Sequence, residues 1–212
     1  MHQFAYRRNR RGEQGYALVS LLLVMSLLAL FALGAAENVR QQGQREREKE
    51  AVFRGEQVAD AIRWYYIGHG GGRGGVNALP TSMDQLTEGL QLPGRTKKIQ
   101  ILRQEAAHDP LSKSGEWKTI AVTSDQFIQF ITALTTYAGG TPPQSRMGGI
   151  PVPQVTNILD TNSTNTAPGT EDDSPSTDGP FIGVASRSQR NSVMTYYGID
   201  HHDGWIFTPL FR

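Results

Sequence analysis

The stretch GYALVSLLLVMSLLALFALGAAE, residues 15–37, decides how the rest of the chain is organised. Residues 16–36 carry no charged side chain, and only Tyr16, Ser20 and Ser26 have a polar group. A helix of this length, at about 1.5 Å per residue, spans about 31 Å, which is the thickness of a hydrocarbon core. A cleavable secretory signal has a shorter apolar region, of about 7 to 15 residues. Residues 16–36 are therefore predicted to be a retained transmembrane helix.

The charges around this segment are unevenly distributed. Four arginines lie within residues 7–11, opposed only by Glu13 before the apolar run begins. Arginines on this flank favour a cytoplasmic N-terminus, with the remainder of the chain on the other side of the membrane. Without residues 1–15 the chain has 17 basic and 19 acidic residues, a formal charge of −2, and the full net charge is +1. This balance gives no reason to expect a nucleic-acid partner.

The helical pattern continues beyond the apolar run. Residues 37–50 are almost wholly polar but consist mainly of good helix formers, which is typical of a solvated helical connector. Apolar residues then return at spacings of three and four, which predicts one buried stripe on an amphipathic helix: Ala51, Val52, Val58, Ala59, Ile62, Tyr65 and Tyr66. We expect a single helix from about Gly15 to about Ile67, with residues 37–67 as its amphipathic, periplasmic part. The glycine-rich residues 68–75 should end it.

Residues 68–138 are predicted to be the first part of a globular domain. Ser82 suits the N-cap of a short helix, and residues 95–108 are ambiguous between strand and helix. Residues 117–122 are typical of a strand. Ser124 is expected to cap a second helix, because Phe127, Ile131 and Leu134 fall on one face.

The last third of the chain divides into two parts. Residues 139–180 are rich in Gly, Pro, Ser, Thr and Asn, and we expect a flexible loop or insertion there. Residues 181–212 contain three strand candidates, at 181–186, 192–198 and 204–210, joined by turns at Gly198 and Asp203-Gly204. The predicted fold class is α+β, with a long N-terminal helix packed on a small antiparallel sheet.

Few residues indicate a chemical site. The absence of cysteine excludes disulfides and thiolate chemistry. The glycines at 70–75 lack the Lys-Ser/Thr ending of a phosphate loop, which favours a helix terminus. Asp200, His201, His202 and Asp203 could bind a cation or form a polar hairpin turn, and adjacent histidines on a strand would point to opposite faces. Trp64, Tyr65, Tyr66, Trp117 and Trp205 are expected to pack in the core.

Serines and histidines occur without a nucleophile elbow or a matched acid in the sequence. We therefore predict no enzyme activity, no catalytic residue, no cofactor and no bound metal.

The junction Gly15-Tyr16-Ala17-Leu18-Val19-Ser20, behind a short basic leader, resembles the start of type IV pilins and type II secretion pseudopilins. The segments LPTSMDQLTEG, DPLSKSGEW and FIGVASRSQRNSVMTYYG are also similar to parts of pseudopilin-like proteins. The resemblance covers residues 8–122 and 181–208. It implies a pilin-like fold, with residues 1–15 as a prepilin leader that a prepilin peptidase removes by cutting after Gly15, followed by N-methylation of Tyr16.

The resemblance also implies the biology of such a subunit. It would be stored as a single-pass protein of the bacterial inner membrane and then assembled, with other pilin-like subunits and an inner-membrane assembly platform, into a periplasmic pseudopilus filament for protein secretion. The family usually has glutamate at the fifth mature position, where this chain has Ser20, which favours a minor or tip subunit. The alternative is a signal-anchored periplasmic binding domain that does not polymerise.

Overall fold

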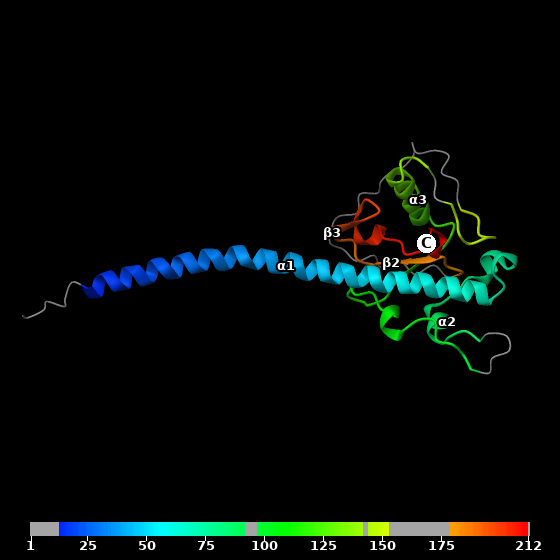
Figure 1. Ribbon diagram of the computed structural model, residues 1–212, viewed down its shortest axis with the longest axis horizontal. Helices are drawn as coiled ribbons and strands as arrows, with labels where there is room; N and C mark the ends of the chain where they lie inside the picture. The colour runs from blue at the N-terminus through cyan, green and yellow to red at the C-terminus, as the bar shows by residue number, and fades with distance from the viewer. Residues whose placement is uncertain (1–12, 92–96, 142–143, 153–178, 212) are drawn as a thin grey trace, which may run out of the picture. The chain divides into compact units, whose positions relative to one another are not determined.

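The computed structural model describes residues 13–91, 97–141, 144–152 and 179–211. Helix α1 runs without interruption from Glu13 to Gly68 over 56 residues (Figure 1). The chain forms two compact units that divide within this helix, residues 1–43 and residues 44–212. The single helix expected from Gly15 to Ile67 is thereby confirmed to within two residues at each end.

Glycines end α1 as the sequence predicts. Gly70, Gly71 and Gly75 have φ values of 97°, 52° and 54°, a left-handed conformation that side chains with a Cβ rarely adopt. The chain then makes two short 3₁₀ turns, η1 at Gly71–Arg73 and η2 at Gly75–Ala78. The glycine-rich stretch therefore serves as a helix terminus.

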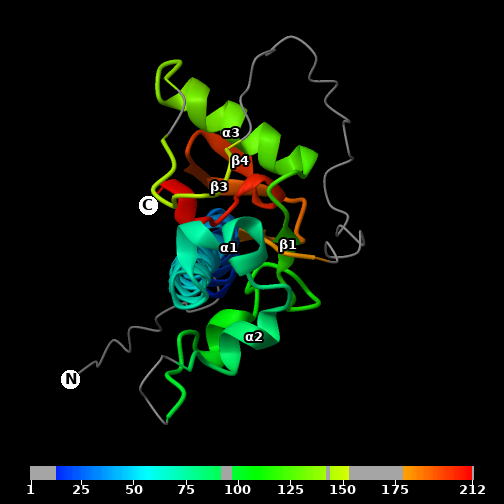
Figure 2. The same ribbon diagram turned by 90° about the vertical axis from the view of Figure 1, so that its right-hand side faces the viewer.

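The buried stripe of α1 forms the centre of the globular unit. Ala51, Val58, Ile62 and Tyr66 are each no more than 3% exposed. Helix α3 and the β3–β4 hairpin lie on one side of the 44–68 part of α1, and α2 lies on the other (Figures 1 and 2). Trp64 was expected in the core but is 60% exposed. Its position is two residues after Ile62, which places it on the opposite face of a helix with 3.6 residues per turn.

The strands form two small antiparallel sheets. Strand β1 (Lys118–Ile120) pairs with β2 (Gly183–Ala185), and β3 (Asn191–Tyr196) pairs with β4 (Ile199–His201). The α+β class is confirmed, although the expected single sheet is two. Buried Trp117 and Trp205, as predicted, pack inside this unit.

The third strand expected at 204–210 is reduced to one bridge between Val184 and Phe207. The chain instead forms 3₁₀ turns η4 (His202–Gly204) and η5 (Pro209–Phe211) on either side of that bridge. Pro209 has no N–H to donate to a ladder, which explains why strand pairing does not extend further.

Three short elements complete the globular unit. Helix α2 spans Met83–Thr87 with Ser82 at its N-cap position, and a 3₁₀ turn, η3, covers Gln104–Ala107. Helix α3 spans Asp125–Tyr137. The Ser124 hydroxyl accepts a hydrogen bond of 3.3 Å from the Phe127 N–H, which confirms the predicted cap.

The flexible loop expected at 139–180 is wrong for residues 144–152. Met147 and Ile150 are 4% and 5% exposed and belong to the core. The Arg146 N–H donates to the Leu210 carbonyl at 2.7 Å. Two apolar side chains and a backbone hydrogen bond thus fix a stretch whose average composition is that of a loop. Residues 142–143 and 153–178, which the same prediction covers, lie outside the described residues.

Helix α1 and the C-terminal segment are in close contact at Gly55. This glycine is buried, and a Cβ atom there would overlap the edge of the Phe207 ring. Since glycine is unfavourable within a helix, its use here is explained by the close approach of the ring. By contrast, a Cβ at Gly43 of the same helix would meet nothing within 4 Å.

We predict opposite effects of the same substitution at these two positions. Gly55→Ala should lower the free energy of unfolding by about 1–3 kcal/mol, because the added methyl group overpacks the contact with Phe207. Gly43→Ala should be neutral or stabilising by up to about 1 kcal/mol, because alanine is the better helix former. Denaturant unfolding of the full chain in detergent micelles measures both. Equal stability of Gly55→Ala and the unsubstituted protein would contradict the close packing.

Candidate functional site

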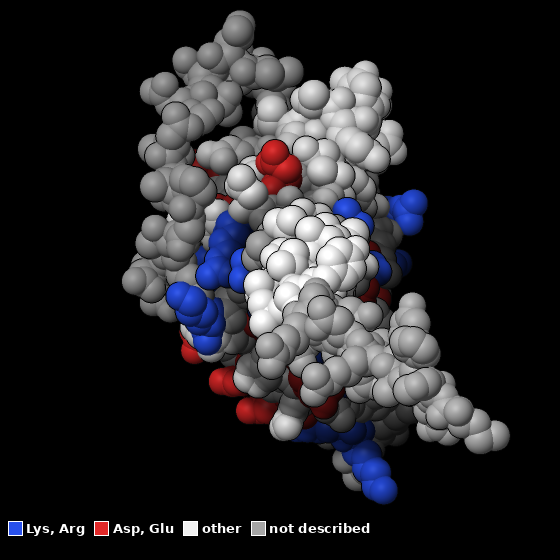
Figure 3. Space-filling model, turned by 90° about the vertical axis from the view of Figure 1, so that its left-hand side faces the viewer, with Lys and Arg blue, Asp and Glu red and all other residues white. Residues whose placement is uncertain are grey.

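The first candidate site is the apolar part of α1. Residues Gly15–Ala32 have a mean hydropathy of 2.3, none of this window is buried, and the helix is long and apolar enough to cross a membrane. Leu18 and Phe31, for example, are 61% and 74% exposed. The described part of this segment has no Lys, Arg, Asp or Glu side chain, and it is correspondingly white in Figure 3. So large an exposed apolar surface indicates contact with lipid or with another apolar chain.

The residues singled out in the sequence lie at the beginning of this segment. Gly15 is in the first turn of α1, where a Cβ atom would meet nothing within 4 Å. Tyr16 is 81% exposed. The Ser20 hydroxyl donates to the Ala17 carbonyl at 2.9 Å. Serine therefore satisfies its own polar group within the helix and presents no charge.

The second candidate site is a buried carboxylate that sequence reasoning missed. Glu48 is fully buried on α1. Its oxygens accept hydrogen bonds from the backbone N–H groups of Val193 and Met194, at 2.9 and 2.8 Å. The Gln44 amide donates to it at 2.8 Å, and His202 Nε2 lies 3.0 Å from its Oε1 atom. One carboxylate therefore connects the start of the globular unit to β3 and to the turn after β4.

These contacts keep Glu48 ionised. Burial by itself raises the pKa of a carboxyl group, but the hydrogen bonds from His202, Val193, Gln44 and Met194 outweigh it and lower the pKa of Glu48 below its ordinary value of 4.5. Because an ionised carboxylate only accepts hydrogen bonds, His202 Nε2 is the donor in this pair. In a neutral imidazole, Nδ1 is then left as an acceptor.

The polar contacts continue from His202 into the core. His202 Nδ1 lies 3.2 Å from the Ser188 hydroxyl, and the Ser188 N–H donates to Ser186 Oγ at 3.1 Å. The Ser186 hydroxyl donates to Asp109 at 2.7 Å. Burial raises the pKa of Asp109, and the Ser186 hydrogen bond offsets part of that effect. The result is a chain of hydrogen bonds from α1 to the loop before β1.

Ser188, His202 and Glu48 have the order of a nucleophile, a base and an acid, although no matched acid was expected from the sequence. The hydrogen-bonded order of these three side chains resembles that of a hydrolytic triad. All three residues are at most 3% exposed, however, so the Ser188 hydroxyl does not face a space that a substrate carbonyl could enter. The arrangement is suited to holding the C-terminal segment on α1 rather than to acyl transfer.

The Asp200–Asp203 segment separates its two histidines, as predicted. His202 is buried against Glu48, whereas His201 faces solvent, with Nδ1 3.3 Å from Asp200 and Nε2 3.8 Å from Asp203. Burial raises the pKa of Asp203, with the charge of His201 opposing that shift. Within the described residues no group of three His, Asp or Glu side chains is placed to hold a metal ion. The four residues do not form the expected hairpin turn, because Asp200 and His201 belong to β4 and His202 and Asp203 to the 3₁₀ turn η4 that follows it.

Glu48 was predicted to lie in a solvated connector, and that prediction is wrong. The burial of Glu48 could have been predicted from its spacing relative to the apolar residues of the buried stripe. Glu48 precedes Ala51 by three residues and Gly55 by seven, so it lies on the face that carries Val58 and Ile62. A charged residue in phase with a buried stripe indicates a paired carboxylate.

Comparison with known proteins adds no relatives: no family model, no curated protein and no solved structure matches this chain.

We predict that Glu48→Gln lowers the free energy of unfolding by about 2–3 kcal/mol at neutral pH, because it replaces the charged acceptor of two backbone donors and an imidazole. The matched control is Glu46→Gln. Glu46 is exposed and forms a surface ion pair with Lys49 at 2.9 Å, so we expect a change within about 0.5 kcal/mol. Denaturant unfolding of the full chain in micelles compares the two.

The contribution of Glu48 to the free energy of unfolding should change with pH in a defined direction. The pKa of Glu48 is lowered on folding, so its charge stabilises the protein above pH 4.5, its ordinary pKa, and that stabilisation is lost as the pH falls through the folded-state value. The stability difference between the unsubstituted protein and Glu48→Gln should therefore shrink below about pH 4.5. A difference that is constant down to about pH 3 would show that the charge is not what matters.

Proposed function

We propose that this chain is a pilin-like subunit, of the pseudopilin type, that is processed by a prepilin peptidase and assembled into a periplasmic filament. The observation that carries the proposal is that the two parts of α1 have different surroundings. Its first part, residues 15–32, is apolar and exposed, and its last part, from Glu48 to Tyr66, buries one face in a small α+β unit. A helix of this kind can anchor a globular unit in lipid and later exchange lipid for neighbouring apolar helices.

Further support comes from the junction at Gly15. The basic leader places positive charge on the side of the membrane where translation occurs, so the bond after Gly15 would face a peptidase on the cytoplasmic side. The globular unit would then be periplasmic. In this proposal the mature chain begins at Tyr16, whose α-amino group is methylated, and its partners are other pilin-like subunits and an inner-membrane assembly platform.

The processing step is tested by the mass of the mature protein. In cells with active prepilin peptidase we expect a chain that starts at methylated Tyr16, whereas Gly15→Val should remain full length. Because a Cβ at Gly15 meets nothing within 4 Å, this variant tests the peptidase and not the fold. Gly43→Val, at an equally open position of the same helix, should be processed normally.

Recovery of the full-length chain from membranes that contain active peptidase would contradict the proposal. That outcome would favour a signal-anchored periplasmic binding domain that does not polymerise.

The position within the filament follows from Ser20. In a low-dielectric interior a carboxylate at the fifth mature position attracts the ammonium group of a neighbouring chain. Ser20 offers only a hydroxyl, which already donates to Ala17. The subunit can supply its own N-terminal ammonium to a glutamate elsewhere, but it cannot accept one. We therefore assign it a minor or tip position.

We expect the purified mature protein to form no long filaments alone and to be incorporated when a partner pilin with the family's glutamate is added. Ser20→Glu should increase self-association, because it restores the missing acceptor. Ser26→Glu is the matched control, since Ser26 also bonds back to its helix, to the Leu22 carbonyl at 2.8 Å, but does not occupy the fifth position. Electron microscopy measures filament length. Long homopolymers of the unsubstituted protein would contradict the tip assignment.

A further inference from the structure

Gly43 is a glycine within helix α1 that packing does not explain. Glycine is unfavourable inside a helix, because it loses more backbone freedom on folding than alanine does. At Gly55 and Gly68 of the same helix a close neighbour accounts for the glycine, since a Cβ atom would overlap the side chain of Phe207 or Leu90. At Gly43 a Cβ atom would meet nothing within 4 Å. A residue that weakens the helix is therefore present where no close contact requires it.

The position of Gly43 coincides with the boundary between the two compact units of the chain, which divide between Gly43 and Gln44. Among the described residues, the contacts of α1 with the C-terminal part of the chain begin at Gln44, whose amide donates to the Asn191 carbonyl at 3.0 Å. Gln41, Gln42 and Gly43 itself are exposed. Gly43 is thus the last residue of α1 before the globular unit begins.

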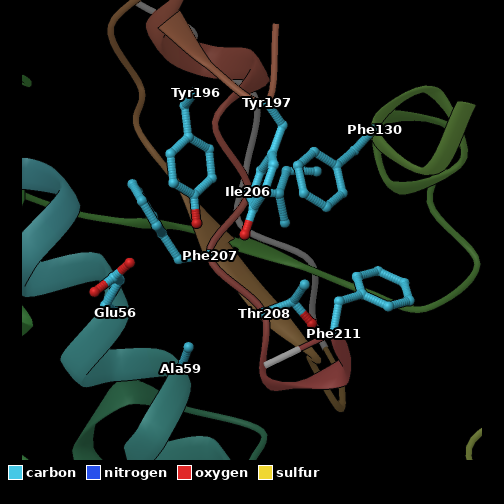
Figure 4. Close-up of a pocket in the computed structure, with 9 residues that line it drawn as sticks. All are labelled: Glu56, Ala59, Phe130, Tyr196, Tyr197, Ile206, Phe207, Thr208 and Phe211. Carbon is cyan, nitrogen blue, oxygen red and sulfur yellow. The ribbon is translucent and has the colours of Figure 1, made fainter. Parts of the chain in front are cut away.

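From Gln44 onwards α1 is held both by pairs of its own side chains and by packing. In Figure 4, Glu56 and Ala59 of this part of the helix face Phe207 across a small pocket that all three residues line. Ala59 is only 2% exposed. Side-chain pairs three or four residues apart, which stabilise a helix, join Gln44 to Glu48, Glu46 to Lys49, and Glu50 to Arg54.

Residues 39–43 lack both kinds of support. None of their side chains forms a hydrogen bond or an ion pair with another residue in the part of the chain that the structure describes. Val39 is 67% exposed, and valine is one of the poorer helix formers. This stretch therefore keeps its helical form through backbone hydrogen bonds that are open to water, and Gly43 is its least helix-favouring residue.

We propose that Gly43 is a hinge at which α1 bends reversibly, so that the globular unit changes its tilt while the apolar part of the helix stays in the membrane. Hinges are a few residues that absorb changes in φ and ψ, and glycine has the widest range of both. Bending at Gly43 leaves the contacts of Gln44 and Glu48 in place and uncovers no buried side chain. Its cost is limited to a few backbone hydrogen bonds that water can replace.

A variable tilt gives the globular unit a range of orientations in which to meet a partner at the membrane surface. This inference goes beyond filament assembly, and it holds whether or not the chain polymerises.

The test measures distances between two spin labels, by double electron–electron resonance, in the full chain reconstituted in lipid nanodiscs. Because the chain has no cysteine, two introduced cysteines carry the only labels. Ser26→Cys and Thr136→Cys place one label on the apolar part of α1 and one at an exposed position of α3. We expect a broad distribution of distances. Glu46→Cys with Thr136→Cys is the internal control, and it should give a narrow distribution because both labels lie beyond Gly43.

Three variants of the Ser26–Thr136 labelled chain locate the hinge. Gly43→Ala should reduce the population of bent states about fivefold, the ratio that corresponds to the difference in helix propensity between glycine and alanine. Adding Gln42→Gly to Gly43→Ala moves the glycine by one residue and should restore the broad distribution. Gly15→Ala is the matched control, because Gly15 is equally open but lies outside the labelled interval. It should leave the distribution unchanged.

Each of three results would overturn the proposal. The first is a narrow distribution for the Ser26–Thr136 pair in the otherwise unsubstituted chain. The second is an equally broad distribution in Gly43→Ala, which would place the bend elsewhere in α1. The third is an equally broad distribution for the Glu46–Thr136 pair, which would place the motion within the globular unit. None of these results depends on cleavage after Gly15, so the hinge and the proposed processing are tested separately.

Discussion

The buried carboxylate of Glu48 constrains the rest of the globular unit. A carboxylate that is buried away from water requires several hydrogen-bond donors. For Glu48 these are two backbone N–H groups of β3, His202, and Gln44 on the same helix. Since β3 and His202 belong to the last part of the chain, this group fixes the C-terminal segment against α1 at one register. A slip of the helix would leave a carboxylate and two backbone N–H groups unpaired in the interior.

With that register set, the close contact of α1 with Phe207 becomes possible. Gly55 lies two turns beyond Glu48, and the absence of a side chain there lets the Phe207 ring reach the helix. Phe207 also exchanges two backbone hydrogen bonds with Val184, which ties the helix contact to β2. Packing of α1 thus depends on about its last six turns, from Glu48 to Gly68, whereas the exposed apolar residues 15–32 take no part in it. That separation leaves residues 15–32 available for lipid or for other helices, as the proposed function requires.

The sequence predicts those features whose cause is local. The apolar run, the length of α1, its glycine terminus and the Ser124 cap follow from composition, periodicity and capping chemistry over a few neighbouring residues. Features that depend on distant partners could not be found in this way. Glu48 was assigned to solvent because its partner His202 is 154 residues away. The third strand is shorter than its apolar pattern predicts because Pro209 has no N–H to donate. Met147 and Ile150 pack in the core although their surroundings have the composition of a loop.

The most direct measurement of the central constraint is hydrogen exchange at the backbone N–H groups of Val193 and Met194 in the full chain, followed by NMR in micelles. Both groups donate to Glu48. The account predicts that they exchange as slowly as the buried amides of α1 near Ile62, and that both lose their protection in folded Glu48→Ala while the α3 amides near Phe130 retain theirs. Fast exchange of Val193 and Met194 in the unsubstituted protein would contradict it, because a carboxylate that fixes the C-terminal segment must protect the amides that hold it.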